Sequence, residues 1–329
     1  MRTAARFEGV GIDAGHYESF YIKATEPGGG RSVWLRYTVH KRPSDAPTAS
    51  LWLTLFDTKA SGPRATKATF GAAELGAPEG TYIKIDGAEL VPGSASGSIS
   101  GDGPEASWDL RFTDGRETLY HLPYERLYTS ALPRTKLLSP YPASHFDGEL
   151  VIGGERVLLA GWPGMVGHNW GSEHAERWIW LQASDLGGRT GDYIDAAIGR
   201  VKIGRWTTPW VANGQIVLDG EPLRLGGLTS AYGTEVDEGP AACELLLPGR
   251  NVRVKASVKA DPKDVVAWVY ADPKGPEHNT LNCSISDLRL DVERPGHKTA
   301  TVEVSKAAAY ELGSRDTDHG IALQPFADG

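Results

Sequence analysis

The sequence is poor in cysteine and has no apolar segment at its start. Cys243 and Cys283 are the only cysteines among its 329 residues, and neither lies in a spacing typical of a metal or redox site. The first ten residues are partly charged and lack the apolar run of a secretory signal peptide. Two isolated cysteines without such a segment are typical of a reducing compartment, so we expect a cytoplasmic protein.

Long hydrophobic runs and basic clusters are missing as well. The longest apolar stretches, such as Val265–Tyr270, are far shorter than the roughly 20 residues that span a bilayer as a helix, so we expect no transmembrane segment. The net charge of −8 and the absence of Lys/Arg clusters argue against a nucleic-acid partner. With 40% hydrophobic residues the chain should fold, and its length favours two domains.

Glycine, proline and aromatic residues, in contrast, are plentiful. The 40 glycines, 21 prolines, 10 tryptophans and 12 tyrosines are typical of short strands joined by tight turns. Apolar residues alternate in segments such as Ser50–Asp57, and the Asp-Gly at residues 86–87 is a hairpin turn sequence. Each half carries about eight or nine such segments, enough to close a barrel around a ligand. We predict an all-β protein of two consecutive antiparallel β-barrels, residues 1–164 and residues 165–329.

The region between the two halves is unusually rich in aromatic side chains. Four tryptophans and two histidines lie between Trp162 and Gln182. Trp178, Trp180 and Gln182 should share one face of a strand, because side chains alternate with a period of two. These rings could form a core between the domains or surround a flat, unsaturated ligand, and the pattern alone leaves both interpretations open.

Several motifs resemble one protein family. The Asn-Trp-Gly at residues 169–171 and the Trp-x-Trp-x-Gln at residues 178–182 resemble the signature of the AttH and carotenoid 1,2-hydratase family, which includes tocopherol cyclase and relatives that catalyse pericyclic ring closures. Residues 15–21, 34–37 and 309–320 resemble bacterial members of the same family. The resemblance implies two lipocalin-like (calycin-type) β-barrels, a largely apolar pocket, and protonation of an isoprenoid double bond followed by hydration or cyclisation.

At the position of the acid for such a reaction, the sequence differs from the family pattern. In the hydratases and cyclases that this chain resembles, an Asp or Glu stands two residues before the Asn, and Gly167 occupies that position here. The candidate catalytic residues are therefore Glu18, His168 and Glu173. A carboxylic acid that an apolar cavity keeps protonated could protonate the alkene, because burial disfavours the charged form. The predicted ligand-binding residues are Asn169, Trp170, Trp178, Trp180, Gln182 and Trp34.

Simpler roles are open for these carboxylates. Glu18 could form a buried ion pair with Arg36, and Glu173 and Glu176 could lie in a solvated loop. Each of these interpretations needs only the ordinary behaviour of charged side chains. The sequence does not decide between them and catalysis.

A metal site finds little support in the spacing of the histidines. His168 and His174, with Glu173 between them, match neither the helical zinc motif nor its inverse. A loop could still assemble such ligands. The prediction is that the protein uses no metal and no cofactor.

The predicted partner is a small lipophilic molecule, isoprenoid or polyketide-like, held in an apolar cavity. Cyclisation, hydration and isomerisation are the candidate reactions. The alternative is a non-catalytic intracellular carrier or sensor of a hydrophobic ligand. A third interpretation, a carbohydrate-binding or surface module, requires exposed, coplanar tryptophans. The oligomeric state and the barrel that holds the ligand are left open.

Overall fold

The structure is a computed structural model that describes residues 3–101, 103–113 and 117–326, and strands dominate this part of the chain. Its helical elements are short 3-10 segments. The prediction of an all-β protein is confirmed. The 3-10 segments are η1 (Phe7–Gly9), η2 (Ala72–Glu74), η3 (Glu125–Tyr128), η4 (Leu186–Gly188), η5 (Leu228–Gly233) and η6 (Pro262–Asp264).

The first half of the chain forms a 12-stranded antiparallel sheet in the order β4-β3-β2-β1-β12-β11-β9-β8-β7-β6-β5, with β10 paired to β11. Residues from β1–β3 and from β6–β9 share one hydrophobic core, so the sheet curls around it like a barrel. Its strands are β1 (His16–Thr25), β2 (Arg31–Lys41), β3 (Thr48–Asp57), β4 (Arg64–Phe70), β5 (Leu75–Gly76), β6 (Ile83–Ile85), β7 (Ala88–Val91), β8 (Ser94–Ile99), β9 (Ala106–Phe112), β10 (Leu119–Tyr120), β11 (Thr135–Ile152) and β12 (Glu155–Gly171).

The second half forms a 10-stranded antiparallel sheet in the order β18-β17-β14-β13-β24-β23-β21-β20-β19, with β22 paired to β23. A bridge between Leu225 and Gly249 joins the end of β18 to the end of β20, which curls this sheet as well. Its strands, with the separate pair β15–β16, are β13 (Arg177–Ser184), β14 (Tyr193–Arg200), β15 (Lys202–Ile203), β16 (Trp206–Thr207), β17 (Val211–Leu218), β18 (Glu221–Gly226), β19 (Glu235–Glu238), β20 (Ala242–Pro248), β21 (Arg253–Lys259), β22 (Val266–Tyr270), β23 (His278–Glu293) and β24 (Ala300–Ser314).

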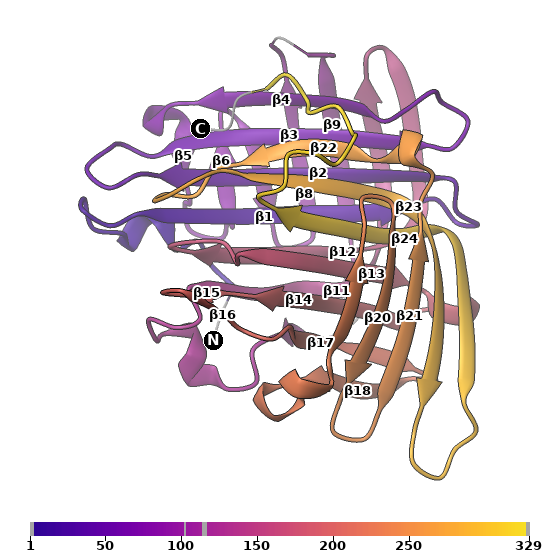
Figure 1. Cartoon of the computed structure of the whole chain (residues 1–329). Coiled ribbons are helices and arrows are strands. Elements are labelled where there is room, and N and C mark those ends of the chain that lie inside the picture. The colour runs from indigo at the N-terminus through magenta and orange to yellow at the C-terminus, as the bar shows by residue number, and fades with distance from the viewer. Residues whose placement is uncertain (1–2, 102, 114–116, 327–329) are drawn as a thin grey trace.

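Burial along the strands shows how the two sheets meet. Strand β9 alternates strictly between buried and exposed residues, as expected for one face on a core and one in solvent. Strand β1, in contrast, is buried at every residue. Its second face packs against the other sheet, and Figure 1 shows β22 and β23 lying across β1–β3. The two barrels therefore share an extensive buried contact.

The chain passes from the first sheet to the second between Gly171, the end of β12, and Arg177, the start of β13. The boundary expected near Gly164 falls inside β12. The division into two domains remains a prediction. The change of sheet places the boundary to be tested between Gly171 and Arg177.

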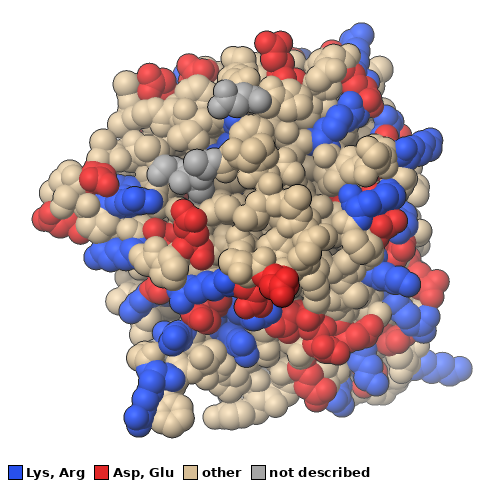
Figure 2. Space-filling view, turned by 45° about the horizontal axis from the view of Figure 1, so that its top comes forward, with Lys and Arg blue, Asp and Glu red and all other residues tan. Residues whose placement is uncertain are grey.

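The surface carries charges of both signs. On the face that Figure 2 shows, Lys and Arg side chains are interspersed with Asp and Glu around an uncharged central area. Among the described residues, no helix has the length and hydropathy needed to cross a bilayer.

Candidate functional site

The layer of side chains between β1–β3 and the strands β13, β22, β23 and β24 is called the seam below. From the first sheet, Tyr21, Trp34 and Trp52 pack into the core of the second half. The Trp52 ring lies edge-on to Trp268, with 5.0 Å between the ring centroids. The seam is therefore built by both halves, and aromatic rings fill much of it.

Two predicted ligand-binding residues reach the seam from the first sheet. Trp34 is buried there, and Asn169 pairs across the ladder with Ser19, so the two side chains share a face. Ser19 accepts a hydrogen bond of 2.7 Å from Nε of Arg36, whose guanidinium lies 3.9 Å from the centroid of the Tyr270 ring. The buried Oδ1 of Asn169 has no hydrogen-bond partner. This face thus presents polar groups toward the second sheet.

The other three predicted residues of this group come from β13. Trp178 is partly buried, and Trp180 lies edge-on to Tyr21 at 5.3 Å between centroids. Gln182 is fully buried and donates a hydrogen bond of 2.8 Å to Oγ of Ser184. The strand alternation places these side chains on one face, and that face borders the seam.

Glu18, His168 and Trp170 lie on the opposite face of the first sheet. His168 stacks on Phe20, with 3.9 Å between ring centroids, and Phe20 belongs to the core of the first half. Trp170 stacks on His168 at 4.6 Å. The structure therefore splits the predicted site, because adjacent residues of a strand point to opposite faces.

Glu18 is the centre of a buried hydrogen-bond network. Its carboxylate accepts bonds from Nε2 of His168 at 2.7 Å and from the backbone N–H groups of Arg6 and Phe7 at 2.9 and 2.8 Å. Nε2 of His16 lies 3.3 Å away. These contacts anchor the N-terminal segment at Arg6 and Phe7 to β1.

The environment of Glu18 favours its ionised form. Burial alone would raise the pKa of this carboxyl, but hydrogen bonds from His16 and His168 outweigh it and lower the pKa from 4.5 to about 2. These contacts therefore favour the ionised carboxylate over the protonated acid that the sequence allowed for Glu18. The alternative pairing with Arg36 is also absent, since Arg36 donates to Ser19.

This lowered pKa predicts a specific acid sensitivity. The folded state keeps Glu18 ionised at a pH where the unfolded chain binds a proton, so its stabilisation is present above about pH 4.5 and is lost as the pH falls toward 2. The contribution is on the order of 3 kcal/mol. Urea unfolding of the protein and of Glu18→Gln between pH 6 and 3 checks this. The difference in free energy of unfolding should shrink with acid, and a constant difference would contradict it.

Glu173 and Glu176 lie between β12 and β13, away from the seam interior. Glu173 forms an ion pair with Arg134, and Glu176 pairs with Arg315 at 2.8 Å. Both side chains are partly exposed. Their contacts match the simpler interpretation of solvated ion pairs.

Gly167 is a glycine because of its neighbour across the sheet. Tyr21 pairs with Gly167 in the register, and a Cβ at Gly167 would overlap the Tyr21 ring. The backbone there does not have positive φ, so only the ring requires glycine. The Tyr21 ring therefore fills the space that a side chain at Gly167 would need.

Asp195 on β14 is a seam residue that the sequence analysis missed. It is fully buried, and it accepts hydrogen bonds from Oγ of Ser139 and, at 3.0 Å, from Nε1 of Trp180. Nε2 of His121 lies 3.3 Å away. Burial alone would raise the pKa of Asp195, but His121 and the hydrogen bonds lower it below its usual range. Ser139 and Asp195 both approach the same ring nitrogen of His121, which is not the geometry of a nucleophilic triad.

Glu311 on β24 is a second missed carboxylate. It accepts bonds from Nε1 of Trp178 at 3.0 Å, Nδ2 of Asn282 at 3.2 Å and the hydroxyl of Tyr270 at 3.3 Å. Burial, Asp195 and Glu311 together raise the pKa of Tyr21 well above its ordinary value. The sequence signal for Asp195 was a single acidic residue within a mainly apolar strand, and that for Glu311 was an acidic residue within the mainly apolar C-terminal part of β24.

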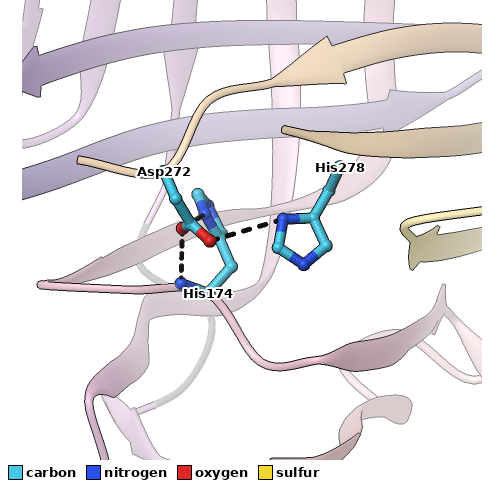
Figure 3. A group of neighbouring side chains, drawn as sticks. All are labelled: His174, Asp272 and His278. Carbon is cyan, nitrogen blue, oxygen red and sulfur yellow. Dashed lines mark hydrogen bonds and ion pairs between the residues drawn. The ribbon is translucent and has the colours of Figure 1, made fainter. Parts of the chain in front are cut away.

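Three residues at one end of the seam could hold a metal. His174 donates its backbone N–H to Oδ1 of Asp272 at 2.8 Å, and its Nδ1 lies 2.7 Å from the same oxygen. Nδ1 of His278 lies 3.5 Å from Oδ2 of Asp272. Figure 3 shows the three side chains pointing toward one another. Burial and His174 lower the pKa of His278 to about 4, so its imidazole is neutral.

A small cavity opens into the seam beside this group. Its volume is about 20 Å³, room for roughly one water molecule. Tyr17, Arg36, His40, His174 and Tyr270 are among its lining residues, so the lining is more polar than the apolar pocket expected from the resemblance. A larger hollow of about 690 Å³ lies on the outer surface, over β9, β11 and β12.

Most tryptophans are buried. Among the described residues, Trp34, Trp52, Trp108, Trp162, Trp170, Trp180 and Trp268 are each at most 7% exposed, whereas Trp206 is 69% exposed. A carbohydrate-binding surface would need several exposed, coplanar rings. Burial of these rings opposes that interpretation.

Sequence comparisons give distant relatives without an assigned function. No family model matches the chain. Two uncharacterized proteins of Mycobacterium tuberculosis, from strains CDC 1551/Oshkosh and ATCC 25618/H37Rv, are each 24% identical to it over 288 residues, covering 85% of this chain and 82% of theirs.

Comparison with solved structures addresses the fold. A candidate AttH protein from Nitrosomonas europaea superimposes with a TM-score of 0.59 and 13% identity, covering 95% of this chain and 94% of the other. Kievitone hydratase from Nectria haematococca gives a TM-score of 0.49 and 13% identity over 93% and 90% of the two chains. The chain therefore has the AttH-type fold of two lipocalin-like β-barrels, as its motifs predicted.

Proposed function

We propose that this protein binds a small lipophilic, unsaturated molecule of the isoprenoid or polyketide class at the seam and catalyses its hydration, cyclisation or isomerisation there. The observation that carries the proposal is the meeting, around Tyr21, of aromatic rings from both sheets with two carboxylates of the second sheet, the fully buried Asp195 and the half-buried Glu311. Trp180 lies edge-on to Tyr21 and donates to Asp195. Both Asp195 and Glu311 act electrostatically on the Tyr21 hydroxyl.

Ring faces at the seam are suited to positive charge. The Arg36 guanidinium lies 3.9 Å from the Tyr270 ring centroid, and Nζ of Lys67 lies 3.9 Å from the Trp52 ring centroid. These two rings are already paired with protein cations, so a carbocation formed from an alkene would be stabilised by other rings of the seam, such as Tyr21 and Trp180, and by the carboxylates beside them.

Asp195 is suited to accept a proton. In a hydration, a proton supplied by solvent adds to the alkene, water adds to the resulting cation, and the oxonium then gives its extra proton to a base, from which it returns to solvent. The lowered pKa of Asp195 keeps it ionised and fits it for that last step. A cyclisation or isomerisation directed by the shape of the site would need only orientation.

Ligand entry requires movement of the seam side chains. A cavity of about 20 Å³ is too small for a lipophile. Arg36, His174 and Tyr270 line it and are the groups that would have to separate. Binding should therefore be accompanied by local opening between the two sheets.

The test is identification of the ligand and of its product. Native mass spectrometry with organic extraction should find a stoichiometric lipophile in the purified protein, and extracts should show its conversion. Asp195→Asn should slow the conversion by at least about 100-fold, the lower end of a general-base contribution. Asp237→Asn, at an exposed position of β19, is the matched control and should not change the rate.

The carrier alternative gives a different result in the same experiment. A carrier would return its ligand unchanged from the wild-type protein and from Asp195→Asn alike. The polar lining of the seam cavity favours turnover over simple shielding. If nothing co-purifies and a panel of lipophiles leaves the tryptophan fluorescence unchanged, binding at the seam is refuted and the rings are an interdomain core.

A further inference from the structure

The group of His174, Asp272 and His278 is assembled from distant parts of the chain. His174 lies between β12 and β13, Asp272 follows β22, and His278 begins β23. Figure 3 shows that the two imidazole rings approach the carboxylate from different sides. The fold thus brings together three side chains that the linear spacing of histidines did not connect.

The distances within the group suit a bound ion. One ligand atom from each residue can be chosen so that all three lie within 4.8 Å of one another. Zinc–nitrogen and zinc–oxygen bonds of about 2.0–2.2 Å in tetrahedral geometry place ligand atoms roughly 3.3 Å apart. Nδ1 of His278 lies 3.5 Å from Oδ2 of Asp272, close to that value. Nδ1 of His174 is hydrogen-bonded to Oδ1 of Asp272 at 2.7 Å, which leaves Nε2 of His174 as the atom that would bind the ion.

Several polar atoms of the group are buried without a hydrogen bond of normal geometry. They are both ring nitrogens of His278, Nε2 of His174 and Oδ2 of Asp272. His278 is fully buried and Asp272 is 3% exposed. Buried polar atoms almost always have partners, and leaving them without one costs free energy. A single cation would satisfy an atom from each residue at once.

The surroundings hold the rings in place and leave one side open. Tyr17 stacks on His174 at 3.8 Å between centroids, and the Trp178 ring lies 5.2 Å from that of His278. The seam cavity, with room for about one water, borders His174. Three protein ligands with space for a water are the arrangement of catalytic rather than structural metal sites.

We propose that His174, Asp272 and His278 bind a divalent transition-metal ion of the imidazole-preferring class, with Zn²⁺ as its simplest representative. Two imidazoles and one carboxylate are the donor set of such ions, whereas Mg²⁺ and Ca²⁺ prefer oxygen ligands. This site is independent of the proposed turnover of a lipophile, because it is defined by metal binding alone.

The experiment measures metal binding directly. The whole chain is treated with a chelator, dialysed and titrated with ZnCl₂ by calorimetry and with CoCl₂ by visible absorption. We expect one ion per chain, a visible cobalt spectrum and a higher Tm with zinc. His278→Ala should weaken binding by more than about 100-fold, at least the loss seen when an outer-shell partner is removed.

Two further variants keep the result interpretable. His174→Gln tests the same site if His278→Ala unfolds. His145→Ala removes a histidine that also pairs with a carboxylate, Nε2 to Oδ2 of Asp185 at 2.8 Å, but lies outside the group. It should bind metal like the wild-type chain. Failure of the wild-type chain to bind either ion, or equal affinity in His174→Gln and the wild-type chain, would overturn the proposal.

Discussion

Replacing Glu18 by alanine is expected to lower the free energy of unfolding by about 3–5 kcal/mol. This is the range observed when one partner of a buried charged pair is removed and the other is left behind. The change removes the acceptor of the His168 ring and of the Arg6 and Phe7 backbone N–H groups. These donors would remain in a region that water does not reach freely. Urea unfolding at pH 7, followed by tryptophan fluorescence, measures the loss.

Two comparisons separate this mechanism from a simple loss of packing. Glu18→Gln keeps an acceptor oxygen but loses the charge, so it should cost about the 3 kcal/mol of the ionisation, and Glu18→Ala should cost more because it also loses the acceptor. Glu303→Ala removes an exposed carboxylate that pairs with Arg289, and surface pairs of this kind contribute at most about 1 kcal/mol. Hydrogen exchange at residues 6–9 should also rise in Glu18→Ala, because that segment is anchored to the carboxylate. A loss as small as that of Glu303→Ala would show that the network is not stabilising.

The strands could be predicted because their signals are local. Alternation in Ser50–Asp57 and the Asp-Gly at residues 86–87 correspond to β3 and to the turn between β6 and β7. The shared face of Trp178 and Trp180 also follows from the period of two. These features need only neighbouring residues, so one sequence was enough.

The site could be predicted only in part because it depends on which strands pair and which face meets the other sheet. Alternation separates Asn169 from His168, but it does not say which of them faces the seam. Glu18 meets His168 only because β1 pairs with β12. Asp195 and Glu311 reach the seam through pairings of β13 with β14 and β24. No local pattern encodes these contacts.

Introducing a side chain at Gly167 is expected to lower the free energy of unfolding. A Cβ there would overlap the Tyr21 ring, which is itself packed edge-on against Trp180. Overpacking of this kind typically costs about 1–3 kcal/mol. Gly167→Ala should show that loss in urea unfolding, and Gly167→Asp should show more, because it also buries a carboxylate.

The cause can be isolated with a double-mutant cycle. Tyr21→Ala removes the ring and opens the space, so Gly167→Ala should cost much less in that background than in the wild-type chain.

Gly164 serves as a contrast, because a Cβ there would overlap the backbone of Lys23 and Ala24 as well as the Phe146 ring. Gly164→Ala should therefore remain costly whether or not Tyr21 is present. Additive effects of Gly167→Ala and Tyr21→Ala would mean that the ring does not dictate the glycine. A favourable coupling would show that the Tyr21 ring is what excludes a side chain at Gly167.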